Sequence, residues 1–451
     1  MVAAWYIREN VFLVSSGMLQ TLYRGLTRIG GPALRFYLHR RRLAGKEDPA
    51  RQGERRGLPS CARPEGPLVW FHAASVGESL SILTLIERLV AADPRLGVLV
   101  TTGTLTSAAL MAERLPARAF HQFLPMDRPS YVERFLDHWH PDLALWVESE
   151  IWPNMLWEIR RRGVTAVLIN ARMSERSFRR WQWLPGFIRS LLGTFRVLLA
   201  QTVADAERLR RLGATEVRSI GNLKFAAQPP PADATKLAAL REAIAGRPVW
   251  LFASSHPGED EIAAGVHEAL APRFPGLLTM IAPRHTARGG AIEAMARSRG
   301  LAVARRSQGA LPAARDVIYL ADTMGEMGVL YRLAPVVCVG GSFVPHGGQN
   351  PIEPVQLGAA VLFGTRMTNF AEITAELLAS GGAREVGDPA RLVEAVGGLL
   401  ADGAARARLA VAGAGVLERH RQKVAEEAVA VLRPLLIGVG IVPPGASGAT
   451  T

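Results

Sequence analysis

The chain is poor in cysteine, with only Cys61 and Cys338 among its 451 residues. Two isolated cysteines form neither a disulfide framework nor a CxxC pair, which indicates a reducing compartment. The histidines lack HExxH spacing and the carboxylates lack a DxD pair, so no metal site is expected. The N-terminal apolar stretch from Val11 to Leu26 is shorter than the roughly 20 residues of a membrane-spanning helix. No small-residue cleavage site follows it, which disfavours a signal peptide.

Acidic residues are outnumbered: 40 Asp and Glu face 53 Lys and Arg, for a net charge of +13. This surplus predicts an acidic partner, whether nucleic acid, a phosphorylated substrate or an anionic membrane. No aromatic-and-basic RNA motif is present, so nucleic acid is not expected. A dense basic cluster follows the apolar stretch: His39-Arg40-Arg41-Arg42, Lys46, Arg51, Arg55 and Arg56. We expect a membrane-surface anchor here, the alternative being an amphipathic helix packed on the protein itself.

The rest of the chain alternates short apolar segments with amphipathic stretches, which predicts an α/β fold. The expected strands are Leu68–Ala73, Gly97–Thr102, Leu143–Val147, Ala166–Asn170 and Val197–Gln201, then Val249–Ala253, Leu277–Ala282, Val317–Leu320, Val336–Val339 and Ala360–Phe363. The two series open alike, with GPLVWFHAASVGE echoed by GRPVWLFASSHPGED. We therefore expect two Rossmann-like βαβ domains facing each other across a cleft, with ligands beyond the carboxyl ends of their strands.

The proline-marked segment Gln228-Pro229-Pro230-Pro231 is a linker signal between the two series. It divides the chain into five expected parts. These are an anchor helix and basic segment (1–60), an N-terminal Rossmann-like domain (61–227), a linker (228–246), a C-terminal Rossmann-like domain (247–436) and a disordered tail (437–451).

Glu78 opens a predicted helix directly after a buried strand, in the sequence HAASVGES. Ser75 and Glu78 fit a capping box, in which the serine caps the helix and the glutamate reaches back. The same glutamate is equally placed to act as a catalytic base. A third reading uses Ser75 as a nucleophile, because AASVG is one residue from the hydrolase elbow G-x-S-x-G. No convincing Asp-then-His pair follows in the order that this reading requires.

Three further segments of the first half follow predicted strands. Glu148 and Glu150, in ESEIWPN, are two acids typical of a substrate cleft, although Glu150 can also flank the helix near Pro153. In NARMSERS, Arg172 and Arg176 either hold phosphate or are solvated charges. GNLKF brings Lys224 to the end of the domain, which by itself says little.

The second half is rich in small residues and basic strand ends. Arg284 follows a strand directly in APRH, and DTMGEMG is a small-residue turn into a helix. In GGSFVPHGGQNPIEP, Asn350 looks like an N-cap with Pro351 at the first helical position. Bare amides at such a helix start bind phosphate, and Glu353 either closes a capping box or accepts bonds from ribose hydroxyls.

Taken in order, these motifs resemble the Kdo transferases of lipopolysaccharide synthesis, from about Leu68 to about Phe370. The resemblance implies a two-domain glycosyltransferase of the GT-B type. It would transfer Kdo from CMP-Kdo to the lipid A precursor lipid IVA at the cytoplasmic face of the inner membrane, with no cofactor or metal.

The resemblance also implies roles for particular residues. Glu78 matches the general base, and Lys224 with an acid of the ESE segment matches groups that steady the transition state. The arginines and serine of NARMSERS are assigned to the acceptor: Arg172, Ser174 and Arg176. The segments matching CMP contacts are Pro283 and Arg284, Met324, Gly325 and Glu326, and Asn350, Pro351, Ile352 and Glu353.

One position departs from the family pattern. The family usually reads GGHN where this chain has Gln349 before Asn350. Glutamine donates a hydrogen bond but carries no positive charge. The alternatives kept open are a GT-B enzyme for another nucleotide sugar, a serine hydrolase built on Ser75, and a non-catalytic membrane-surface protein. The motifs leave open how many Kdo residues are added.

Overall fold

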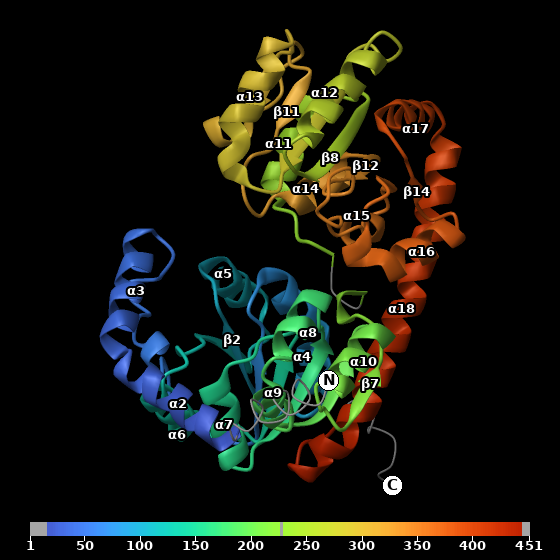
Figure 1. Cartoon of the computed structure of the whole chain (residues 1–451). Helices are drawn as coiled ribbons and strands as arrows, with labels where there is room; N and C mark the ends of the chain where they lie inside the picture. Colours follow the sequence, from blue (N-terminus) through green and yellow to red (C-terminus); the bar gives the residue numbers. More distant parts are fainter. Residues whose placement is uncertain (1–15, 226–228, 444–451) are drawn as a thin grey trace, which may run out of the picture. The chain divides into compact units, whose positions relative to one another are not determined.

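The computed structural model describes residues 16–225 and 229–443, which fall into two compact units (Figure 1). Of the described residues, 16–225 and 421–443 form the first unit, and the second runs from Pro229 to His420. Each contains one seven-stranded parallel sheet. The predicted α/β fold with two parallel-sheet domains is thereby confirmed.

The first sheet has the strand order β3-β2-β1-β4-β5-β6-β7. Its strands are β1 Leu68–His72, β2 Gly97–Thr102, β3 Ala119–Phe123, β4 Leu143–Val147, β5 Thr165–Ala171, β6 Phe195–Ala200 and β7 Val217–Ser219. Every residue of β1, β2 and β4 is buried, as in parallel strands covered on both faces. The direction of the crossovers reverses between β1 and β4, and at such a point ligands bind beyond the strand ends.

The second sheet has the order β10-β11-β9-β8-β12-β13-β14. Its strands are β8 Val249–Ser255, β9 Leu278–Pro283, β10 Val303–Arg305, β11 Ile318–Leu320, β12 Val336–Val339, β13 Ala360–Phe363 and β14 Arg384–Glu385. Here the reversal lies between β8 and β12, which are paired in register from Val337 with Leu251.

Helices separate the strands in both units. In the first unit they are α2 Ser16–Ile29, α3 Gly31–Leu43, α4 Val76–Ala92, α5 Leu105–Arg114, α6 Pro129–Trp139, α7 Pro153–Arg161, α8 Glu175–Trp181, α9 Pro185–Leu192 and α10 Val203–Arg211. In the second they are α11 Ala234–Ile244, α12 Glu259–Leu270, α13 Gly289–Ser298, α14 Met327–Leu333, α15 Ile352–Gln356, α16 Ala371–Ala379 and α17 Pro389–Ala401. The last helix, α18 Gly403–Gly438, contributes residues to both units.

All ten predicted strands are present, with ends shifted by at most two residues. Four others were missed: β3, β7, β10 and β14. All four are outermost strands of their sheets, each with a neighbouring strand on one side only. An edge strand is only partly covered, so its sequence need not be a continuous apolar run.

The C-terminal boundaries differ from the prediction. Residues 421–436 belong to the first unit and not, as predicted, to the C-terminal domain. Within the expected tail, α18 continues to Gly438, and the Val442 amide donates to the Asp93 carboxylate over 3.1 Å. The described part of this segment, up to residue 443, is therefore seated on the first unit; residues 444–451 lie outside the described ranges.

The described part of the N-terminal segment, from residue 16, likewise belongs to the first unit. Residues 11–15 of the predicted helix lie outside the described ranges. Within those ranges, α2 is fastened by Tyr23, whose hydroxyl donates to Asp127 over 2.9 Å, and by Arg24, which pairs with the buried Glu158 at 2.8 Å. No helix in the described part of the chain is long and apolar enough to span a membrane.

Fewer side chains of the predicted basic cluster are fully exposed than we expected. Arg55 is 5% exposed and binds Glu47, while Arg51 forms an ion pair with Glu54 at 2.8 Å. Arg41 also pairs with Glu47. Arg55 is therefore buried, whereas the side chains of Arg41 and Arg51 are 27% and 29% exposed, and the buried carboxylates of Glu47 and Glu54 neutralise the three charges.

Candidate functional site

Glu78 lies in the first turn of α4, just beyond the carboxyl end of β1. Its side chain is 8% exposed and accepts two hydrogen bonds, from the Ala74 amide at 2.8 Å and the Ser75 hydroxyl at 2.7 Å. Ser75 caps α4 by accepting from the Glu78 amide. The capping-box prediction therefore holds, except that Glu78 reaches back to Ala74, one residue before the cap.

The carboxyl group of Glu78 has an unusually high proton affinity. Burial, together with the neighbouring carboxylates of Glu148 and Glu150, raises its pKa to about 7, against the two hydrogen bonds that lower it. A carboxyl group with a pKa near 7 is about half ionised at neutral pH. It is thus suited to accept a proton from a hydroxyl group at that pH.

Glu148 follows β4 directly and forms an ion pair with Lys224, with Nζ 2.7 Å from Oε1. Its backbone is left-handed, with φ of 60°, a conformation uncommon for glutamate and typical of functional positions. Lys224 also approaches α4, because its Cε lies 3.9 Å from the point that a Cβ on Gly77 would occupy. Glu78, Glu148 and Lys224 are called the carboxylate site below.

Lys224 is held in place by residues that the sequence did not single out. It belongs to the short 3-10 helix Leu223–Phe225, and the Leu223 amide donates to the side chain of Asn170 over 2.9 Å. Asn170 is fully buried at the end of β5. Asn222 accepts from the Lys224 amide at 2.9 Å and donates to Gln201, just after β6, at 3.3 Å. A polar residue ending an apolar strand was the available signal for Asn170 and Gln201.

Four other predicted residues of the first unit lie apart from this ion pair. Glu150 accepts from the indole of Trp152 at 2.8 Å. Ser174 caps α8 by accepting from the Ser177 amide at 3.2 Å. Arg172 and Arg176 are solvent-exposed. The structure thus distinguishes Glu148, which is paired with Lys224, from Glu150, which is bound to an aromatic neighbour.

The hydrolase reading of Ser75 gains no support from the geometry. Its hydroxyl donates to the Glu78 carboxylate and accepts from the Glu78 backbone amide, so both its donor and its acceptor are used in the helix cap. His72, the nearest histidine in the sequence, is buried beneath the strand end with Nδ1 near Thr101, and burial lowers its pKa to about 3. A serine nucleophile needs an accessible base at its hydroxyl.

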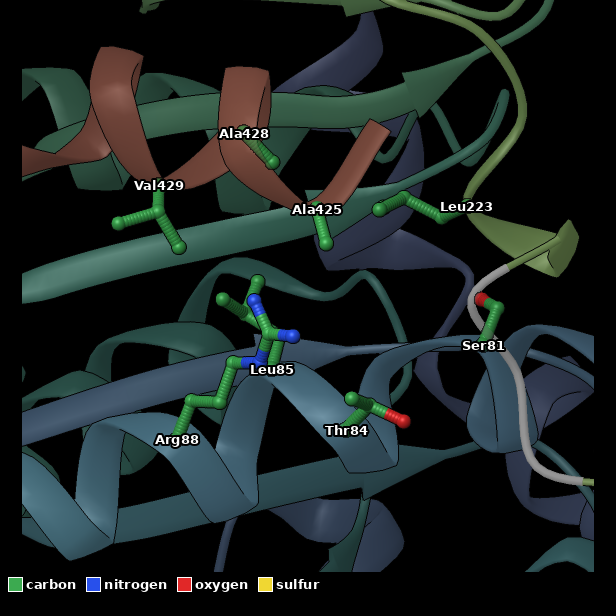
Figure 2. A pocket seen from close by; sticks show the side chains of 8 residues that line it. All are labelled: Ser81, Thr84, Leu85, Arg88, Leu223, Ala425, Ala428 and Val429. Carbon is green, nitrogen blue, oxygen red and sulfur yellow. The ribbon is translucent and has the colours of Figure 1, made fainter. Parts of the chain in front are cut away.

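A cavity lies between α4 and the C-terminal part of α18 (Figure 2). Leu85 and Arg88 contribute from α4, and Ala428 and Val429 from α18. Leu223, the neighbour of Lys224, closes one end. The returning C-terminal helix therefore packs behind the helix that carries Glu78.

In the second unit, basic and imidazole side chains gather beyond the carboxyl ends of β8 and β9. The rings of His256 and His346 are tilted by 34° with their centroids 3.9 Å apart, and the ring centroid of His285 lies 6.1 Å from that of His256. Burial, together with the neighbouring His346, His285, Arg284 and Arg288, lowers the pKa of His256 to about 4. Because arginine and imidazole groups can donate hydrogen bonds to an anion, this cluster is a candidate anion-binding site and is called the anion site below. Sequence reasoning had singled out only Arg284 and its buried neighbour Pro283 among them.

The predicted donor turn Met324-Gly325-Glu326 is exposed at Met324 and has φ of 81° at Gly325. Glu326 is bound within the protein: Arg306 donates to both oxygens at 3.0 and 2.8 Å, and Lys236 pairs with it at 2.9 Å. These partners hold the pKa of Glu326 near 2. Its carboxylate is therefore occupied, and the turn's backbone is the part left to contact a ligand.

The segment from Asn350 to Glu353 differs in detail from the prediction. The helix α15 starts at Ile352 with Pro351 at the cap position, so the predicted cap at Asn350 was wrong by one residue. Asn350 still accepts from the Ile352 amide at 3.0 Å and donates to Glu353 at 3.1 Å. With only five residues, α15 contributes little helix dipole to a phosphate.

Within the described ranges, no group of three or more His, Cys, Asp or Glu side chains is arranged to hold a metal ion.

The sequence of this chain is similar to those of one known protein family. Residues 50–227 match the model of the 3-deoxy-D-manno-octulosonic-acid transferase (kdotransferase) family. A 3-deoxy-D-manno-octulosonic acid transferase of Rickettsia bellii is 34% identical over 77% of this chain and 82% of its own length. The corresponding transferase of Bordetella pertussis is 35% identical over 80% of this chain and 86% of its own.

Among solved structures, the UDP-GlcNAc 2-epimerase of Neisseria meningitidis bound to UDP-GlcNAc has a TM-score of 0.56 at 14% identity. The match covers 81% of this chain and 100% of the epimerase. At this identity, the likeness concerns the fold alone.

Proposed function

Because the chain belongs to the 3-deoxy-D-manno-octulosonic acid (Kdo) transferase family, we propose that it transfers Kdo from CMP-Kdo to the lipid A precursor lipid IVA. Family membership supports Kdo transfer by a glycosyltransferase. We propose in addition the identity of the donor and of the acceptor, an inverting and metal-independent reaction, and the roles of particular residues. The carboxylate site carries it, since it combines a base of suitable pKa with a fixed cation.

In the proposed reaction, a hydroxyl oxygen of the acceptor attacks the anomeric carbon of Kdo, and the bond from that carbon to the phosphate of CMP breaks. The hydroxyl proton passes to Glu78. A single displacement inverts the configuration at the anomeric carbon. Lys224 stays paired with Glu148, whose carboxylate raises the pKa of Glu78.

The departing CMP carries the electron pair of the broken bond as negative charge on phosphate. Cationic and donor groups of the second unit suit that charge: Arg284, the imidazoles of His256 and His346, and the amides of the Gly325 turn. Preorganised donors of this kind stabilise developing charge in a transition state. For the acceptor, we propose that the exposed Arg172 and Arg176 bind the phosphates of lipid IVA.

The direct test is incubation of the purified chain with CMP-Kdo and lipid IVA, read by mass spectrometry. We expect a mass gain of one or more Kdo units, which also counts the sugars added. A panel of other nucleotide sugars should give no product. Transfer from another donor, with CMP-Kdo untouched, would replace the donor assignment.

We further propose that the enzyme works at the cytoplasmic face of the inner membrane, with α2 and α3 on the lipid surface. One face of α2 packs on the unit, while the opposite face exposes four apolar side chains at helical spacing. These are Met18, Leu22, Leu26 and Ile29, between 56% and 80% exposed, and Phe36 on α3 is 64% exposed. Exposed arginines accompany them: Arg28, Arg35, Arg40 and Arg42. Apolar groups beside basic ones are typical of binding to anionic membranes.

Replacing Leu22 and Leu26 together by glutamate is expected to abolish co-flotation with vesicles containing phosphatidylglycerol. Apolar area is lost and negative charge is added at an anionic surface, so binding should fall at least about tenfold. Val411→Glu, at a 73% exposed site on α18, is the matched control and should float as the native protein does. Equal flotation of the double variant would place the membrane contact elsewhere.

A further inference from the structure

Glu259 occupies the place in the second unit that Glu78 occupies in the first. Both glutamates lie in the first turn of the helix after the opening strand, in the echoed sequences HAASVGE and ASSHPGE. The echo extends into the packing: Trp70 donates to Thr101 over 2.9 Å in the first unit, and Trp250 donates to Thr279 over 2.8 Å in the second. The two units therefore repeat one local design.

The surroundings of the two carboxylates differ. Glu78 accepts two hydrogen bonds and keeps an edge exposed, whereas Glu259 is 0% exposed and accepts four. All four come from backbone amides. His256 and Gly341 donate to one oxygen at 2.8 and 2.7 Å, and Ser342 and Phe343 donate to the other at 3.1 and 3.0 Å. A carboxylate has about four acceptor positions, so Glu259 has no capacity left for a ligand.

The four amides belong to two different loops. His256 lies just after β8, and Gly341 to Phe343 follow β12, the strand beside β8. These loops flank the point where the strand order reverses, which is where sheets of this kind bind ligands. They lie so close that a Cβ on Gly340 would be 2.5 Å from the carbonyl oxygen of Ser254. Glu259 ties the two loops together at the ligand-binding edge.

The tied loops carry the side chains of the anion site. Gln349 has its amide nitrogen 3.0 Å from Nε2 of His256 and 3.4 Å from Nδ1 of His346. Because that nitrogen only donates, both imidazole nitrogens accept, and Gln349 sets the tautomer of each ring. The backbone amide of Gln349 donates to the backbone carbonyl of Gly340 at 2.9 Å, within the loop that Glu259 holds.

We propose that Glu259 is a positioning residue for the phosphate of the nucleotide donor, holding both loops so that His256, His346 and Gln349 face that anion together. The inference rests on the proposed function, which supplies the nucleotide. Glu259 itself touches no substrate. Glu78, at the same position in the first unit, is the proposed general base. The repeated glutamate would therefore accept a proton in one unit and hold two loops in the other.

Glu259→Gln tests this with almost no change of shape. The new NH2 group faces two amide donors that it cannot satisfy, so one loop must move away from the other. We expect the dissociation constant for CMP, measured by calorimetry on the full chain, to rise about tenfold, which is ~1.4 kcal/mol. The KM for CMP-Kdo should rise by a similar factor, while the KM for lipid IVA stays within about twofold.

Two further variants separate positioning from general destabilisation. Glu259→Asp keeps the charge but is one methylene shorter, and should lie between the native protein and the glutamine variant. Should Glu259→Gln fail to fold, Glu259→Asp carries the test. Asp316→Asn is the control, since Asp316 is also buried and accepts a hydrogen bond from a backbone amide, that of Ala313 at 2.8 Å. Asp316 precedes β11 and therefore lies at the amino end of that strand, away from the carboxyl ends.

Unchanged CMP affinity in Glu259→Gln, or an equal loss in Asp316→Asn, would overturn the inference alone. A native protein that binds no CMP would overturn the proposed donor and the inference with it.

Discussion

Glutamine in place of Glu78 is expected to abolish Kdo transfer and, at pH 8, to make the first unit more stable. The loss of a general base costs about 10²- to 10⁴-fold in rate. The gain in stability arises because the ionised carboxylate is 8% exposed and lies near two other acids. Glutamine keeps the acceptor for Ala74 and can donate to Ser75, so the helix cap is retained.

The sign of the pH dependence follows from the raised pKa. Between the ordinary value of 4.5 and about 7, the folded protein binds this proton more tightly than the unfolded chain does. Stability is therefore lost as the pH rises through this range, and the loss is complete above about pH 7. It amounts to about 3 kcal/mol for a shift of this size. The native protein and the variant should melt alike near pH 4 and differ by about 10 °C at pH 8.

The measurements are melting curves from pH 4 to 8 and the pH profile of kcat/KM. In the native enzyme kcat/KM should rise with pH around an apparent pKa near 7, and this inflection should vanish with Glu78. Glu113→Gln, at an exposed position on α5, is the control and should change neither quantity. Full activity in Glu78→Gln would reduce Glu78 to a cap and move the base to the segment from Glu148 to Glu150.

Breaking the ion pair from its two ends is expected to shift the pKa of Glu78 in opposite directions. Lys224→Met leaves the Glu148 carboxylate uncompensated beside Glu78, which raises that pKa and moves the pH profile to higher pH. Glu148→Gln removes a like charge and moves the profile to lower pH. Each single change should lower the transfer rate at least about 100-fold, since the site loses a fixed charge near the reacting atoms.

The double variant Glu148→Gln with Lys224→Met should lie between the two singles in its pH profile. In a double-mutant cycle, we expect a coupling of about 1–3 kcal/mol between these partners. Glu150→Gln is the matched control, because Glu150 is bound to Trp152 and not to Lys224. We expect it to cost at most a few-fold in rate. Shifts of the profile in the same direction, or an equal loss at Glu150, would contradict the assigned pair.

Local sequence was sufficient to predict the central strands and the position of Glu78. Strands such as β1 and β4 are covered on both faces, so their burial demands an uninterrupted apolar run that can be read directly. The edge strands were missed because they are only partly buried and do not require an uninterrupted apolar run; β7 and β14 are mostly exposed. The helix cap at Ser75 is also a local interaction, and its spacing alone predicted it.

Tertiary structure decided which polar residues act together. Glu148 and Glu150 are nearly equivalent in sequence, and only the approach of Lys224 from 76 positions further along distinguishes them. Likewise, no local pattern shows that Glu259 collects three amides from the loop after β12, or that residues 421–443 return to the first unit. The sequence by itself determined where strands end and helices begin, because those choices depend on neighbouring residues. The pairing of charges and amides across distant segments depends on how the strands are ordered in the sheet, which only the folded chain specifies.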